Sequence, residues 1–221
     1  MYSELTDYEN TYLAFRELTG GTFDLARAAH RDHLLEWLNK WGCRFEIDKF
    51  PKVSEAIAQW NRQYGKELCS DSRNLWHLSD QEIDALGDAY EDLRDRTAFK
   101  YRRGGKLVHR HVGATAASKI LFASKPRAAI AWDDLMRKKM KDSHKRLTYK
   151  QFLELAKGDL ISLKMQCEKH DVKLTALAAE LGRRKATAAQ LIGEYYWVTY
   201  TRELEMPNPG TLKQWVKWSK A

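Results

Sequence analysis

Two adjacent carboxylates, Asp133 and Asp134, stand at the end of the apolar run 128–132 and at the head of a predicted helix. The apolar run would hold both carboxylates beside a surface that is partly shielded from water. A carboxylate fixed in such a place can stabilise a developing positive charge or activate a water molecule. Side chains of neighbouring residues at a helix start point in different directions, so one of the two is expected to face a reacting group. We expect this residue to be Asp133, with Asp134 as the alternative.

A glycine turn precedes this carboxylate pair. Gly113 can adopt a positive φ, and it is followed by residues of little bulk, Ala114, Ala116, Ala117 and Ser118. They predict a helix whose first amides stay open to an anion such as a phosphate. Lys119 lies on the same predicted helix, and Pro126 ends it.

The remaining elements must position these groups, and the apolar spacing predicts that they are nearly all helical. Ser79 with Glu82 and Thr148 with Gln151 are capping boxes that begin two of the helices. We interpret 100–112 as a basic loop, although Gly104 and Gly105 are also typical of a short hairpin turn. The other predicted helices cover 22–41, 53–68, 174–181 and 187–204, with a Trp215/Trp218 tail after Pro207 to Gly210.

The fold class we predict is therefore all-α, a compact multi-helix domain. With 221 residues and 43% hydrophobic content the chain can bury a core. It is expected to form one domain over 1–221, or two lobes made of 1–100 plus the C-terminal helices and of 101–170.

Charge indicates the class of partner. The formal net charge is +8 and the sequence pI is about 9.3, which favours an acidic partner such as nucleic acid or an anionic surface. Cations concentrate in 100–111 and again in 137–146, on either side of the glycine-to-aspartate segment.

The sequence disfavours metal-binding, secreted and membrane-spanning proteins. Cys43, Cys69 and Cys167 have no metal-ligand spacing, so we expect reduced thiols, no metal and no cofactor. The N-terminus has no basic leader followed by an apolar core, and no apolar run is long enough to span a bilayer. A cytoplasmic monomer without membrane contact is expected.

The segment 109–134 resembles the core motif of the helix-hairpin-helix DNA glycosylases. In that family a hairpin ending in glycine precedes a helix, and a catalytic aspartate follows at a fixed interval after a loop containing proline or glycine. Here Asp133 follows Gly113 by twenty positions. Of the usual Leu-x-Gly-Val-Gly hairpin only Val112 and Gly113 remain, and His111 replaces the first glycine.

The resemblance implies a multi-helix DNA-binding enzyme that hydrolyses the N-glycosidic bond of a damaged or modified base flipped out of the duplex. Asp133 would be catalytic. Some members use a lysine two residues after the final glycine, where this chain has Thr115. This favours a monofunctional enzyme, although Lys119, one turn further along, leaves lyase chemistry open. The residues expected to contact DNA are Arg102, Arg103, Lys106, Arg110, His111, Val112, Gly113, Ala114, Thr115 and Arg137.

Three alternatives remain open at this point. The departures from the usual motif leave room for an unusual substrate, including hypermodified viral bases, in which case the role would be antiviral defence and not DNA repair. The chain could also be a non-catalytic nucleic-acid-binding protein in which the aspartates only cap a helix. A helical adaptor whose basic surface meets an acidic protein is the third possibility.

Overall fold

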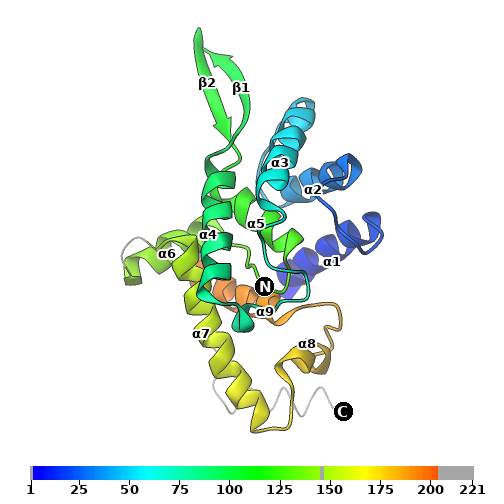
Figure 1. Cartoon of the computed structure of the whole chain (residues 1–221), viewed down its shortest axis with the longest axis vertical. Helices are drawn as coiled ribbons and strands as arrows, with labels where there is room; N and C mark the ends of the chain where they lie inside the picture. The colour runs from blue at the N-terminus through cyan, green and yellow to red at the C-terminus, as the bar shows by residue number, and fades with distance from the viewer. Residues whose placement is uncertain (1, 145–146, 204–221) are drawn as a thin grey trace.

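A computed structural model describes residues 2–144 and 147–203, and it is mostly helical, as the sequence predicts. Figure 1 shows α4 and α5 in the middle of the molecule, α1 to α3 on one side and α6 on the other, with α9 crossing behind α4. The helices are α1 Tyr2–Leu18, α2 Ala28–Lys40, α3 Phe50–Tyr64, α4 Asp80–Asp95, α5 Ala114–Ser124, α6 Asp134–His144, α7 Tyr149–Glu168, α8 Leu177–Glu180 and α9 Ala188–Tyr196.

The segment 100–112 is not a loop, and that interpretation was wrong. It belongs to an antiparallel hairpin of β1 Thr97–Arg103 and β2 Lys106–His111, in which Arg103 pairs with Lys106. Gly104 and Gly105 both have positive φ, the conformation of a two-residue turn that matches the strand twist. Most of its side chains are exposed and basic, so the strands lack the alternating apolar pattern by which a half-buried strand is recognised. In Figure 1 the hairpin projects from the end of α4, away from the helical body.

Both predicted capping boxes are present and fix the starts of α4 and α7. Ser79 Oγ accepts from the Glu82 amide, and the Glu82 carboxylate accepts from the Ser79 amide; Thr148 and Gln151 repeat the arrangement. Helix α2 begins at Ala28, later than predicted, and α1 was not predicted at all. Helix α9 ends at Tyr196 and continues as the π-helical turn Trp197–Thr201. The Trp215/Trp218 tail lies outside the described residues.

The apolar run 128–132 lies in the core. Ala128, Ala129, Ile130 and Trp132 are all buried, and the Trp132 ring stacks on Phe152 of α7 at 4.8 Å between centroids. The carboxylate pair therefore follows a segment that packing holds in place, as the sequence predicts.

Candidate active site

The connection between α5 and α6 is held by hydrogen bonds from α5, from α7 and from the residue that caps α9. Ser118 Oγ on α5 accepts from the Trp132 amide at 2.9 Å. The Tyr149 hydroxyl on α7 donates to the Ile130 carbonyl at 2.8 Å, and Thr187 Oγ1, before α9, donates to the Pro126 carbonyl at 2.6 Å. Since these anchors come from separate parts of the chain, they fix the backbone that delivers Asp133 to the start of α6.

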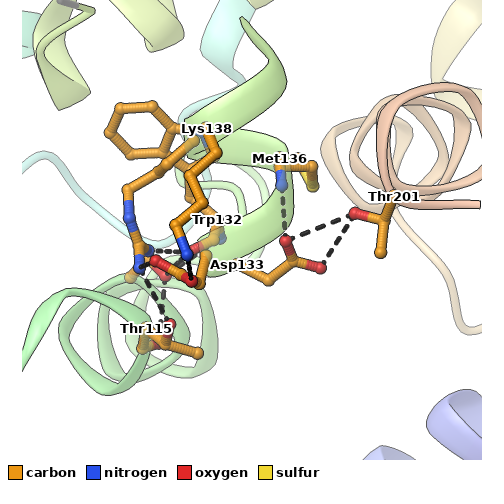
Figure 2. Close-up of polar contacts among 9 residues, drawn as sticks. Thr115, Trp132, Asp133, Met136, Lys138 and Thr201 are labelled. Carbon is orange, nitrogen blue, oxygen red and sulfur yellow. Dashed lines mark hydrogen bonds and ion pairs between the residues drawn. The ribbon is translucent and has the colours of Figure 1, made fainter. Parts of the chain in front are cut away.

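The Asp133 side chain is held by two further contacts, drawn in Figure 2. Its Oδ1 accepts from the Met136 amide at 2.7 Å, which caps the first turn of α6. Thr201 Oγ1, from the π-helical turn, donates to the carboxylate at 3.1 Å from Oδ2 and 3.3 Å from Oδ1. The carboxylate is therefore oriented by a backbone donor and a hydroxyl donor.

Asp134 lies apart from this arrangement. Its exposed side chain forms ion pairs with Lys138 at 2.6 Å and Arg137 at 3.3 Å, and the first of these contacts does most to lower the pKa of the Asp134 carboxyl. Figure 2 shows Lys138 on the Trp132 and Thr115 side of the helix, away from Thr201. Of the two predicted carboxylates, only Asp133 faces the cavity described next.

A cavity opens beside Asp133. It is lined by residues from the four helices α1, α5, α6 and α9, from the connection between α5 and α6, and from the turns that follow α2 and α9. The space between its walls is about 630 Å³, open solvent at its mouth included. Its walls are mainly apolar, and Gly193 on α9 lets that helix approach Ile130, whose Cγ2 would lie 2.8 Å from an added Cβ. The lining residues are Tyr8, Trp41, Lys119, Phe122, Ile130, Ala131, Asp133, Met136, Ala189, Gln190, Gly193, Glu194 and Trp197.

Lys119 lines the same cavity as Asp133, so the structure brings these two predicted site residues together. The Lys119 side chain is buried, and its Nζ donates to the Trp41 carbonyl at 2.9 Å. Burial lowers the pKa of Lys119, and the neighbouring Cys43 and Asp133 oppose that shift only in part. A lysine in this position is costly to the fold, which is common for residues kept for function.

This cost gives a prediction for stability. Because the pKa of Lys119 is lowered in the folded state, the unfolded chain binds its proton more tightly and the buried charge destabilises the fold at neutral pH. Lys119→Met should therefore raise the free energy of unfolding by about 1 kcal/mol at pH 7, despite the lost hydrogen bond. The gain should shrink as the pH rises toward 10.5, the ordinary pKa of lysine.

Denaturant unfolding at several pH values measures this effect. Lys157→Met is the matched control, since Lys157 also donates to a backbone carbonyl, that of Leu78 at 2.7 Å, but it pairs with Asp80 at 3.6 Å and lies away from the cavity. That control should not be stabilised. An equal change in the free energy of unfolding in the two variants would contradict an unfavourable buried charge at Lys119.

The start of α5 provides amides for an anion. Gly113, at φ 85° and ψ 156°, has no capping side chain, and the first amide bonded within the helix is that of Ala117. The Val112 and Gly113 amides donate to the carbonyls of Arg96 and Arg94, each at 3.0 Å. The amides without a backbone partner at this helix start are therefore those of residues 114–116, which include the predicted Ala114 and Thr115 but not Val112 and Gly113.

Arg137 extends this helix start with a cation. Its guanidinium donates to the Trp132 carbonyl at 2.7 Å and to Thr115 Oγ1 at 3.2 Å, and it lies 5.8 Å from the centre of the Trp132 ring. The structure thus joins Thr115 and Arg137, which the sequence predicted separately. Together with Asp133 they place anion-binding groups and a carboxylate on consecutive elements.

The remaining predicted contacts lie on the hairpin. Arg102, Arg103, Lys106 and Arg110 are exposed, and His111 is tied to the Asp95 carbonyl through its Nδ1 at 2.5 Å. Between Thr97 and His111 the sequence has no acidic residue. These cations form a basic arm apart from the cavity and not part of its wall (Figure 1).

Sequence reasoning missed Tyr8, Gln190, Glu194 and Thr201. Each comes from a helix distant in sequence from the Gly113 to Asp133 segment, so no local spacing could identify it. The capping residue Thr187 was a usable signal for the start of α9, but not for the face that α9 turns toward the cavity.

The described residues contain neither a membrane-spanning helix nor a cluster of metal ligands. None of the helices there is long and apolar enough to cross a membrane. In the same part of the chain, no three or more His, Cys, Asp or Glu side chains gather in a way that could hold a metal ion.

Comparison of the chain with protein families, with curated proteins and with solved structures finds no match.

Proposed function

We propose that this protein is a DNA glycosylase of the helix-hairpin-helix type, which hydrolyses the N-glycosidic bond of a damaged or modified base. One observation carries the proposal: Asp133, chosen from its spacing after Gly113, lines an apolar cavity and is oriented there by Thr201 and the Met136 amide. A carboxylate held in this way is suited to a cationic transition state.

The proposed reaction follows from the positions of the groups. The duplex lies against the start of α5, where the free amides and Arg137 hold backbone phosphates. The target base leaves the stack and enters the cavity, whose apolar walls exclude water. As the glycosidic bond breaks, positive charge grows on the sugar, and the Asp133 carboxylate stabilises it or activates the attacking water.

The connection between α4 and α5 supports contact with DNA over a longer stretch. These two helices are joined by the β1–β2 hairpin and not by a tight loop. The Val112 and Gly113 amides, which donate to carbonyls at the end of α4, tie the base of the hairpin to that helix. Its exposed cations would follow the phosphates beyond the flipped nucleotide.

A second candidate is a nucleic-acid-binding protein without catalysis. It is favoured by the hydrogen bond from the Met136 amide to Asp133, because the same contact makes this carboxylate a helix cap. In that case the basic arm and the start of α5 bind phosphate and the cavity has no part in the activity.

Base release separates the two candidates. Purified protein is incubated with duplex and single-stranded DNA that carries natural, damaged and phage-type modified bases. Abasic sites are then cleaved with alkali, and released bases are identified by mass spectrometry. Release of a base supports the glycosylase, and the identity of that base separates a role in repair from one in antiviral defence. Tight DNA binding with no release across the panel supports the second candidate.

The start of α5 gives a prediction for binding. Gly113→Asp adds a negative charge beside the free amides and should weaken binding about tenfold for every DNA sequence alike, because phosphate contacts carry no sequence information. The φ and ψ of Gly113 are almost restricted to glycine, so any side chain also strains the turn. Gly113→Ala carries the strain without the charge and is the control. Fluorescence anisotropy with several duplexes measures the difference, and a sequence-dependent loss would contradict a phosphate site.

A further inference from the structure

The cavity beside Asp133 has walls suited to a flat ring. Tyr8, Trp41, Phe122 and Trp197 supply aromatic surface, and the Tyr8 and Trp41 rings meet edge to face at 4.8 Å between centroids. Aromatic walls bind planar heteroaromatic groups without selecting among them. Discrimination must therefore come from the few polar atoms that line the cavity.

Tyr8, a residue of the cavity wall, carries the first of these polar groups, its hydroxyl. It is buried and forms no hydrogen bond within the described part of the chain. Its ring is fixed between Trp37 and Trp41, at 5.8 and 4.8 Å between centroids. A buried hydroxyl without a partner destabilises the fold, and a ligand that accepts its hydrogen bond would recover that cost.

Lys119 is the second donor. One of its three N–H bonds is directed to the Trp41 carbonyl, and no carboxylate of the described residues forms a salt bridge with it. The ammonium also lies 5.8 Å from the centre of the Trp41 ring. An ammonium group has three donors and no acceptor, so the two N–H bonds that are not directed to the carbonyl can still donate to a ligand.

Gln190 supplies an acceptor. Its Nε2 donates to Glu194 Oε1 at 3.0 Å, which fixes the amide so that Oε1 is left without a partner among the described residues. Glu194 itself is occupied, because Arg183 donates to both of its oxygens, at 2.8 Å from Nη2 to Oε1. The carboxylate is therefore not a free acceptor in this wall.

From this set of two donors and one acceptor we infer that the cavity selects a base with an imide edge, in which two carbonyl oxygens flank a ring N–H, as in uracil- and thymine-type rings. Tyr8 and Lys119 donate to the carbonyl oxygens, and Gln190 Oε1 accepts from the ring N–H. The inference rests on the proposed function, since it assigns the substrate class of the same site.

The same donors assist the departure of the base. When the glycosidic bond breaks, the base leaves with negative charge, which an imide ring places largely on its carbonyl oxygens. Hydrogen bonds from Tyr8 and Lys119 strengthen as that charge develops and so favour the transition state over the ground state. A cytosine-type edge presents an amino group and an unprotonated ring nitrogen, so a donor meets a donor and an acceptor meets an acceptor.

Binding of isolated rings tests the inference without any catalysis. 1-Methyluracil and 1-methylcytosine share the ring and the blocked N1 and differ only in the edge, and ligand-detected NMR titration gives the Kd of each. We expect 1-methyluracil to bind at least about tenfold more tightly. Tyr8→Phe, which removes one oxygen, should raise the Kd of 1-methyluracil about tenfold. Tyr12→Phe, one turn along α1 and absent from the cavity wall, should not.

Three outcomes would overturn the inference: equal or tighter binding of 1-methylcytosine, an unchanged Kd in Tyr8→Phe, or no binding of either ring. Lys119→Met provides a second variant, because it removes a donor at a residue whose loss is not expected to impair folding. Base release from DNA is measured separately. Release of a cytosine- or adenine-type base would overturn the imide assignment and leave the glycosylase intact, whereas absence of any release would count against the proposed function.

Discussion

Asp133→Asn is expected to reduce base release by about 10³-fold or more, because the neutral amide cannot stabilise a cationic sugar or take a proton from water. DNA affinity should change little, since the groups proposed to hold phosphate are the amides at the start of α5, Arg137 and the hairpin cations, and none of them is changed. Single-turnover release of the base, measured beside binding by fluorescence anisotropy, separates the two quantities.

The substitution is well suited to the fold. Asparagine caps helices as well as aspartate does, so its side-chain oxygen can keep the hydrogen bond from the Met136 amide. In the unmodified protein Asp133 Oδ2 accepts from Thr201 Oγ1. The amide nitrogen of asparagine can instead donate to that hydroxyl oxygen. We therefore expect the melting temperature to stay close to that of the unmodified protein, and a loss of release cannot then be attributed to unfolding.

Asp134→Asn is the matched control. It changes the adjacent residue in the same way, at an exposed carboxylate that pairs with Lys138 and does not line the cavity beside Asp133. Base release should persist in this variant. Activity retained in Asp133→Asn, or lost equally in both variants, would contradict the catalytic assignment and favour the reading of Asp133 as a helix cap alone.

The sequence was most informative where the signal was local. The capping boxes at Ser79 and Thr148 depend on contacts three residues apart, and both are present. The step from Gly113 through Pro126 to Asp133 likewise runs along one stretch of chain, and α5 and α6 begin where that stretch predicts. Such features need only backbone geometry and side chains that are close in sequence.

The rest depended on tertiary packing. The cavity wall includes Tyr8 from α1 and Gln190 from α9, which no spacing in the sequence connects to Asp133. The hairpin was interpreted as a loop because its stability comes from the Gly104-Gly105 turn and the strand ladder, while Leu107 and the basic side chains remain exposed. Lys119 was placed on the right helix, but its burial follows from the packing of α2 and α5.

Removal of the hairpin charges should have the second largest effect, on binding and not on chemistry. Arg102→Ala/Arg103→Ala/Lys106→Ala deletes three exposed cations at the tip of the basic arm. If each contacts a phosphate, the slope of log K against log salt should fall in magnitude by about 3, and affinity at low salt should fall roughly 100-fold. Anisotropy titrations from low to moderate salt give both quantities.

Lys169→Ala/Lys173→Ala/Arg184→Ala removes the same charge from exposed positions that follow α7 and α8, at the opposite end of the molecule from the hairpin (Figure 1). A purely global effect of net charge would weaken binding equally in the two triple variants. A local arm predicts that only the hairpin variant changes the slope, while the single-turnover rate at saturating protein stays the same in both, because Asp133 and the cavity are untouched. An equal loss in the two variants would assign the affinity to overall charge, and a slower saturated rate in the hairpin variant would show that the arm also positions the base.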